Sequence, residues 1–317
     1  MSIFPIIALS IELVFIIKGS DWFVDSAIWF ASFFKVPQII IGVVLISVCT
    51  TLPETIVSVS SSLIGYSNLA LGNAIGSISF NTGFILGLVI FVSKPNIHGR
   101  RDFFINGILL LALLLYVMVN IKLFGGIPKG SGFILLGIFV LFLFWNVKRA
   151  EHSAMVEEYI DTDQSDLNRM IVLFIIGMAL IFIGARLLVI NAEIVAKMCG
   201  ISDSVIGLTV AAVGTSLPEL MTAITAMAKG AYSLSIGNII GVNIYNILMA
   251  VSLSAVVGDM KADASWLIFH IPAALLINLA LILFASINRK NFSRFDGFFI
   301  MVLYGVYFCF MTFWGVS

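Results

Sequence analysis

The sequence predicts an all-α integral membrane protein. Hydrophobic residues make up 61% of the 317 residues and charged residues only 11%, whereas a soluble domain has about a quarter of its residues charged. The apolar residues also gather in long runs, and a helix that spans a bilayer needs about 20 of them. Most of the surface is therefore expected to face lipid or other helices. The formal net charge of +0 indicates no nucleic-acid partner.

The apolar runs predict ten transmembrane helices. The first run lacks a basic leader and a small-residue cleavage site, so it is interpreted as a permanent helix rather than a signal peptide. The ten runs cover residues 3–19, 38–64, 68–93, 103–121, 131–147, 170–196, 204–228, 233–257, 264–287 and 296–315.

One long polar stretch, residues 148–169, separates the fifth run from the sixth. It is too polar to span a membrane and is predicted to be a solvated linker. Its acidity is explained by solubility, because nothing else in the sequence supports a regulatory cation site there. The acidic residues of the linker are Glu151, Glu157, Glu158, Asp161, Asp163 and Asp166.

The two halves of the chain are related by an internal duplication. Residues 19–81 align without a gap with residues 184–246. Shared hydrophobicity alone would not match a Pro-Glu pair, a Gly-Asn pair and a separate Asn at the same spacing. The polar segments that match include Pro53/Pro218, Glu54/Glu219, Gly72/Gly237, Asn73/Asn238 and Asn81/Asn246.

The duplication predicts two inverted-topology repeats of five helices each. An odd number of helices makes the second half enter the membrane in the opposite sense, an arrangement common in secondary transporters. The predicted units are residues 1–147, with a core repeat at about 38–93, the linker 148–169, and residues 170–317, with a core repeat at about 204–257.

The distribution of Lys and Arg predicts the orientation of the protein in the cell membrane. With the N-terminus outside, only four lysines fall in outer loops: Lys122, Lys129, Lys197 and Lys261. The inner loops then hold Lys35, Lys94, Arg100, Arg101, Lys148, Arg149, Arg169, Lys229, Arg289, Lys290 and Arg294. Both termini are therefore expected to be extracellular, and the acidic linker cytoplasmic.

Two acidic residues are expected inside the membrane at equivalent positions of the duplicated segments. Glu54 lies in the second run and Glu219 in the seventh. An ionised carboxylate at the centre of a spanning helix costs about 2.5–3.5 kcal/mol on insertion scales, so such residues usually have a function. A helix-pairing role is the alternative, and the duplication weakens it because the repeat axis would bring both acids to one place.

The neighbours of these acids favour a site for a hard cation. Thr50 and Glu54 are four residues apart and share a helical face, as do Thr215 and Glu219. Pro53 and Pro218 each remove a helical hydrogen bond and free a carbonyl oxygen; in transporters, broken helices supply such oxygens to cations. Calcium takes 6–8 oxygen ligands. No His or Cys pair accompanies the acids, which disfavours a transition metal.

The third and eighth runs contribute a second polar set. Residues 71–81 match residues 236–246, and both segments contain Gly-Asn followed by a further Gly and an Asn. Ser77 and Asn81 share a helical face. For Asn81 and Asn246, buried hydrogen bonding between helices is the alternative interpretation, and the glycines are explained by close helix packing.

The chain resembles the sodium/calcium exchanger family of the cation/calcium antiporter superfamily. The resemblance rests on Gly-Ser-Asp-Trp-Phe-Val (19–24), Thr-Thr-Leu-Pro-Glu (50–54), Gly-Thr-Ser-Leu-Pro-Glu (214–219) and the two Gly-Asn-x-Ile-Gly segments. It implies four short or broken core helices around a central ion site, and alternating access by sliding of the first and sixth helices past that core. It also implies calcium and sodium as the transported ions.

The resemblance implies a set of ion ligands in this sequence. Glu54 and Glu219 would be the acids shared by calcium and sodium. Thr50, Thr51, Ser77, Asn81, Thr215, Ser216 and Asn246 match ligand or near-ligand positions, and Ser47 and Ala212 would offer backbone oxygens. This sequence departs from the family pattern at Cys49 and Thr51, where Gly and Ser are usual, at Val242, where Ser is usual, and at Asn246, where some members carry Asp.

Other functions of the same residues are considered. A proton/calcium antiporter on this fold is the nearest alternative, because buried carboxylates hold protons readily. An intramembrane enzyme would need two unlike acid environments, whereas these are matched, and broken inverted repeats suit occluded sites better than a channel. The expected protein is not an enzyme, needs no cofactor, lies in the lipid bilayer and functions as a monomer.

Overall fold

The computed structural model describes residues 4–96, 100–153, 164–198, 212–258, 260–287 and 291–313. Within them the protein consists of helices and two very short strands. The α-helices are α1 (Phe4–Phe33), α2 (Gln38–Ile41), α3 (Ser47–Leu63), α4 (Ser67–Phe80), α5 (Gly87–Ser93), α6 (Arg100–Phe124), α7 (Lys129–Ser153), α8 (Leu167–Met198), α10 (Ala212–Thr215), α11 (Leu217–Ala228), α12 (Tyr232–Tyr245), α13 (Ser252–Val257), α14 (Ile271–Ile287) and α15 (Arg294–Phe313). The strands are β1 (Gly126–Ile127) and β2 (Met260–Lys261).

Among the described residues, four short π-helical segments continue or connect these helices, and a 3-10 turn precedes α8. The π-helical segments are Gly42–Ile46, Asn81–Leu86, Asn246–Val251 and Trp266–His270, and the 3-10 turn is Gln164–Asp166. The helices α2 and α3 therefore form one long rod with the segment between them, as do α4 with α5 and α12 with α13.

Eight helical rods in the described part of the chain are long and apolar enough to cross a membrane. They correspond to the second to sixth and the eighth to tenth predicted runs. The first run corresponds to α1. The seventh run, 204–228, is described only from residue 212, as α10 and α11. The expectation of a multi-pass membrane protein built from helices is confirmed.

The first helix is longer than the sequence predicts. The apolar run ends at residue 19, but α1 continues to Phe33. Its polar residues are accommodated: Ser20 Oγ donates to the Ile17 carbonyl at 2.9 Å, and Asp25 pairs with Lys229 of the neighbouring α11 at 2.7 Å. A hydropathy run stops at such residues, whereas a helix continues wherever they find partners.

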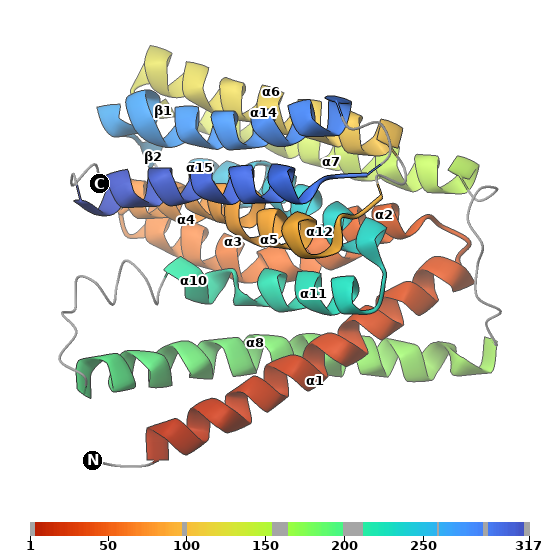
Figure 1. Ribbon diagram of the computed structural model, residues 1–317. Helices are drawn as coiled ribbons and strands as arrows, with labels where there is room; N and C mark the ends of the chain where they lie inside the picture. Colours follow the sequence, from red (N-terminus) through yellow and green to blue (C-terminus); the bar gives the residue numbers. More distant parts are fainter. Residues whose placement is uncertain are drawn as a thin grey trace.

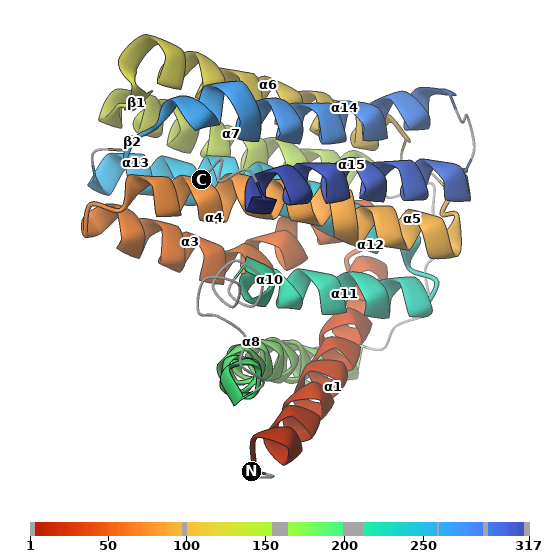
Figure 2. The ribbon, with the colours of Figure 1, turned by 60° about the vertical axis from the view of Figure 1, so that its left-hand side comes forward.

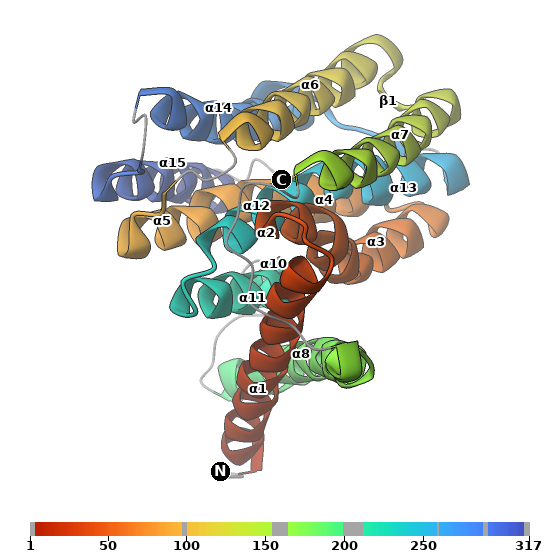
Figure 3. The ribbon, with the colours of Figure 1, turned by 90° about the vertical axis from the view of Figure 1, so that its right-hand side faces the viewer.

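The helices are arranged in layers (Figure 1). Helices α1 and α8 pack along each other on one side, α6, α7 and α14 lie on the opposite side, and the core rods lie between them. The other two views show the same separation of the α1–α8 pair from the rest (Figures 2 and 3). The pair approaches closely at Gly19 and Gly177, because a side chain at Gly19 would lie 2.8 Å from the Gly177 carbonyl oxygen.

The core of the protein is the rod formed by α12 and α13. Every residue from Ser233 to Val251 is buried, although this stretch includes several polar side chains. Ile239, Ile244 and Tyr245 have no exposed surface at all. Polar groups in such a position must be paired inside the protein or by a ligand, so this rod is where a transport site is expected.

Short pairings between the two halves lie at opposite ends of the bundle. At one end Gly126 of β1 pairs with Lys261 of β2, and at the other Asn96 pairs with Asn291. The offset that aligns residue 19 with residue 184 also aligns 96 with 261 and 126 with 291. The pairing of 96 with 291 therefore corresponds to the pairing of 261 with 126, so each pairing is the repeat-related counterpart of the other.

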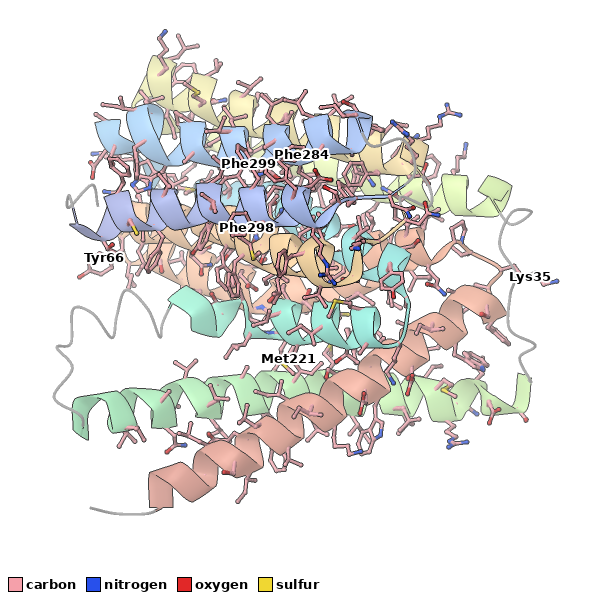
Figure 4. All side chains as sticks on the ribbon, viewed as in Figure 1. Lys35, Tyr66, Met221, Phe284, Phe298 and Phe299 are labelled. Carbon is pink, nitrogen blue, oxygen red and sulfur yellow. The ribbon has the colours of Figure 1, made fainter. Side chains whose placement is uncertain are left out.

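The two ends of the bundle can be followed in the figures. Tyr66, in the turn after α3, and Lys35, in the turn after α1, lie at opposite ends (Figure 4). Helix α1 begins and α15 ends at the same end (Figure 1). The end of α7 and the start of α8, which border the acidic linker, lie at the other end. Of the linker, residues 154–163 lie outside the described residues.

Candidate ion-binding site

Two fully buried glutamates come from the two duplicated segments. Glu54 lies on α3 and Glu219 in the first turn of α11, and both have 0% exposure. The two carboxylates are close enough for their charges to interact. None of their four oxygens has a hydrogen-bond partner among the described residues. Because a buried carboxylate without a partner is very costly, this pair is suited to bind cations or protons.

Further unpartnered polar atoms come from the same core helices. Within the described residues, Thr50 Oγ1, Ser216 Oγ, Asn81 Oδ1 and both polar atoms of the Asn246 amide are buried without a hydrogen-bond partner. Since buried polar groups are normally hydrogen-bonded, unpartnered atoms on the helices of both duplicated segments leave oxygens available to a bound cation.

Two other predicted ligands are already engaged within the protein. The Thr51 hydroxyl donates to the Ser47 carbonyl at 2.7 Å. The single hydrogen of the Ser47 hydroxyl is shared between two acceptors, the Gly42 carbonyl at 2.7 Å and the Asn238 carbonyl of α12 at 2.9 Å. Each of the two hydroxyl oxygens keeps its acceptor lone pairs, so both residues retain the capacity to bind a cation through the hydroxyl, and the Ser47 hydroxyl also links α3 to α12.

The remaining predicted ligands lie on the same elements. Ser77 is buried on α4, one turn before Asn81. Thr215 is half-buried at the end of α10, directly before Ser216. Ala212 begins α10, and only its backbone is described. Ion coordination by these three residues, as by all the other predicted ligands, stays a prediction.

Irregular helix geometry coincides with the polar residues. A π-helical segment begins at Asn81 and another begins at the equivalent Asn246, while a third ends directly before Ser47. Single-turn π-helical segments inside α-helices are frequent at functional sites. They shift the backbone hydrogen bonds by one residue, which loosens carbonyls and redirects side chains.

The two prolines act differently on their helices. Helix α3 runs through Pro53 without interruption. In the other half, a turn at Ser216 separates α10 from α11, and Pro218 stands in the first turn of α11, where a proline is tolerated because no hydrogen bond is lost. The break that the sequence predicts at both prolines is therefore seen in the second segment, and in the first the irregularity lies earlier, at Gly42–Ile46.

One residue near the site was not among the predicted ligands. Asn73 on α4 donates through Nδ2 to the Glu54 carbonyl and to Ser58 Oγ, both at 2.9 Å. It therefore holds the backbone of Glu54 in place. Its signal in the sequence was its identity with Asn238 in the duplication, which points to a shared role without saying which one.

Comparisons with known proteins agree on a family. The family described as sodium/calcium exchanger protein matches residues 4–148 and 169–313. An uncharacterized membrane protein of Methanocaldococcus jannaschii is 32% identical over 292 residues, covering 92% of this chain and 93% of that protein. The sodium/calcium exchanger MaX1 of Methanosarcina acetivorans is 30% identical over 335 residues, covering 93% of this chain and 95% of that protein.

Solved structures give the same result. The fold is similar to that of the sodium-calcium exchanger NCX_Mj soaked with zero Na+ and Ca2+, with a TM-score of 0.84 and 30% identity, covering 96% of this chain and 98% of that one. The same exchanger soaked with 10 mM Na+ and 10 mM Sr2+ gives a TM-score of 0.83 at the same coverage.

Proposed function

This chain belongs to the sodium/calcium exchanger family, and on that premise we propose that it exchanges sodium ions for calcium at a site built around Glu54 and Glu219. The observation that carries the proposal is the pair of fully buried carboxylates whose oxygens have no partner among the described residues. Two ionised carboxylates balance one calcium ion or two sodium ions. Membership of the family supports a cation/calcium antiporter, and the coupling ion and the ligands are the proposal.

The neutral oxygens around the acids suit calcium and sodium. Calcium takes 6–8 oxygen ligands at 2.3–2.6 Å, and two carboxylates supply at most four. Thr50, Ser216, Asn81 and Asn246 have buried atoms able to complete the shell. Carbonyl oxygens of Ser47 and Ala212 are the proposed backbone ligands, and Thr51, Ser77 and Thr215 the remaining hydroxyls.

Two inverted five-helix repeats would make the site accessible from either side in turn. Contacts between equivalent positions support this arrangement. The pairing of 96 with 291 has its counterpart in that of 261 with 126. Likewise, a side chain at Gly19 would meet the Gly177 carbonyl, and one at Gly184 would meet the equivalent Glu12 carbonyl at 3.1 Å. Repeats related in this way can exchange conformations and so open opposite sides.

The α1–α8 pair is the proposed moving part. The two helices pack extensively on each other, and α1 meets the core mainly through α11. A partly buried hydrogen bond joins the pair: Asn191 Nδ2 on α8 donates to Glu12 Oε1 on α1 at 2.6 Å. A pair that is fastened internally and lies beside the core can slide as one body and cover or uncover Glu54 and Glu219.

Calcium uptake into proteoliposomes tests the proposal. The purified protein should take up calcium-45 when sodium is placed inside, and a pH gradient without sodium should drive little uptake. Glu54→Gln and Glu219→Gln should each abolish uptake. Asp296→Asn serves as the matched control, since Asp296 is a buried acid on α15 outside the site (3% exposed), and its uptake should persist.

Two outcomes would overturn parts of this proposal. Uptake driven equally well by a proton gradient would favour the proton/calcium antiporter on the same fold. Near-normal uptake by either purified glutamine variant would show that the transport site does not require both glutamates.

A further inference from the structure

A chain of hydrogen bonds leads from Asn81 to α14, outside the predicted site. Asn81 Nδ2 donates to Asn243 Oδ1 at 3.2 Å, and Asn243 Nδ2 donates to Thr82 Oγ1 at 2.7 Å. The Thr82 hydroxyl then donates to Asn278 Oδ1 at 2.8 Å. Finally, Asn278 Nδ2 donates to the Ala274 carbonyl at 2.8 Å. All four side chains are buried, with exposures of 0–2%. We call Asn243, Thr82 and Asn278 the amide chain.

The direction of this chain is fixed at its far end. The Ala274 carbonyl can only accept a hydrogen bond, so Asn278 must turn its NH2 group toward Ala274 and its oxygen toward Thr82. Thr82 has a single hydroxyl hydrogen, which goes to that oxygen, and it must therefore accept from Asn243. The reverse order would set the Asn278 oxygen against the Ala274 oxygen and leave the Asn278 oxygen buried without a donor, which is costly.

Asn243, the member of the amide chain next to Asn81, determines which group Asn81 presents to the ion site. Asn243 turns its oxygen toward Asn81, so the NH2 group of Asn81 donates its hydrogen bond to Asn243. Its Oδ1 is left buried without a partner among the described residues. We propose that the amide chain is a positioning device that locks Asn81 with its carbonyl oxygen, rather than its NH2 group, facing the transported cation. The proposal rests on the function proposed above and adds three positioning residues to it.

The other half of the protein has no such chain. The duplication aligns Asn81 with Asn246, and it aligns Asn243, Thr82 and Asn278 with Ile78, Ile247 and Leu113. The equivalents of the amide chain are thus all apolar. Both polar atoms of Asn246 lack a partner within the described residues. The two amides are therefore inequivalent: Asn81 offers a fixed oxygen, and Asn246 can turn either its oxygen or its NH2 group toward the site.

The inference predicts a specific kinetic effect. Without the chain, Asn81 can rotate and direct NH2 hydrogens at a cation, so binding weakens while the moving helices are untouched. Thr82→Val keeps the shape and removes the hydroxyl relay; the KM for calcium should rise about tenfold, on the scale of one lost hydrogen bond to a charged ligand. The maximal rate should change by less than about twofold, because a lost contact that affects only binding alters KM alone.

Matched variants separate positioning from general damage. Thr82→Ser keeps the hydroxyl and should restore a KM near that of the unchanged protein. Asn278→Leu installs the residue found at the equivalent position 113 and should reproduce the KM rise from outside the ion site. Asn146→Leu is the control: Asn146 is equally buried and makes the same kind of bond to its own helix, to the Phe142 carbonyl at 2.8 Å, away from Asn81.

The experiment is calcium-45 uptake by sodium-loaded proteoliposomes containing the full chain, with KM and maximal rate measured for each variant. A second measurement repeats Asn278→Leu in an Asn81→Ala background, using calcium-induced thermal stabilisation of the purified protein as the readout of binding. Positioning through Asn81 predicts no further loss of calcium affinity in that background.

Three results overturn the proposal. The first is a KM that is unchanged in both Thr82→Val and Asn278→Leu. The second is an equal rise in Thr82→Val and Thr82→Ser. The third is the same loss of affinity from Asn278→Leu with and without Asn81. Failure of sodium-driven uptake in the unchanged protein would instead count against the proposed function, so the two are distinguished.

Discussion

Lys229, at the end of α11, forms an ion pair with Asp25 of α1, with 2.7 Å between Nζ and Oδ1, and lies 3.5 Å from Asp21 Oδ1. The pair connects the proposed moving helix to the core at one end of the bundle. Its counterpart at the other end does not exist, because the duplication aligns Lys229, Asp25 and Asp21 with Ile64, Ile190 and Arg186. If α1 moves as proposed, this ion pair stabilises the arrangement described here.

Replacing the lysine should therefore shift the balance between the two access states. Exposed ion pairs contribute about 0.2–1 kcal/mol, so we expect Lys229→Met to change the ratio of apparent calcium affinities at the two membrane faces by about 1.4- to fivefold, with little effect on thermal stability. The measurement is calcium-dependent exchange from each face of oriented vesicles. Lys35→Met is the control, since Lys35 lies at the same end and points away from the bundle (Figure 4). Equal ratios in both variants would show that the ion pair has no such role.

Val242 should weaken sodium binding in one half of the site. Its equivalent in the first repeat, Ser77, carries a hydroxyl, whereas Val242 is fully buried and offers none. We expect weak sodium cooperativity in the unchanged protein and stronger cooperativity in Val242→Ser. Sodium titrations of calcium efflux measure the Hill coefficient. A coefficient near that of three cooperating ions, with no gain in Val242→Ser, would show that the hydroxyl is not limiting.

The net charge moved in each transport cycle depends on how many sodium ions bind, and therefore on whether sodium binds near Val242. Three sodium ions against one calcium would move one net positive charge, whereas two against one would be electroneutral. If the weakened half of the site stays without sodium, exchange should generate no current on a solid-supported membrane, and Val242→Ser should introduce one. A large current from the unchanged protein would contradict the expectation.

Potassium should not be required. Asn246 is neutral where some members of the family carry Asp, and in this structure its amide is fully buried. A neutral amide provides no third charge to hold an additional monovalent cation beside two glutamates. Adding potassium to a potassium-free uptake assay should change the rate little. A strict dependence on potassium would refute the role assigned to this amide.

The orientation in the membrane is testable by labelling. The count of basic residues predicts extracellular termini and a cytoplasmic linker at 148–169. A cysteine introduced as Ser153→Cys should resist membrane-impermeant reagents added to intact cells and react after the cells are permeabilised. A cysteine at Ser2 should behave in the opposite way. Labelling of position 153 from outside would reverse the assignment.

The sequence by itself determined the class of the protein and the identity of its central acids. Apolar runs of sufficient length allow few alternatives to a helical membrane protein, since only helices and closed barrels satisfy the backbone in lipid. The duplication singled out Glu54 and Glu219 because two acids at equivalent membrane positions are costly. The motifs around them placed the chain in its family, and the family comparison confirmed that assignment.

The tertiary structure decided which polar groups are hydrogen-bonded within the protein and which remain available to a ligand. Hydropathy could not show that α1 extends to Phe33, because its length depends on the pairing of Asp25 with a lysine more than 200 residues away. Nor could it distinguish Asn81 from Asn246, which the alignment treats as equal. Their difference arises from Asn243 and Asn278, residues on other helices, and hydrogen bonds between helices depend on direction and distance, which exist only once the chain is folded.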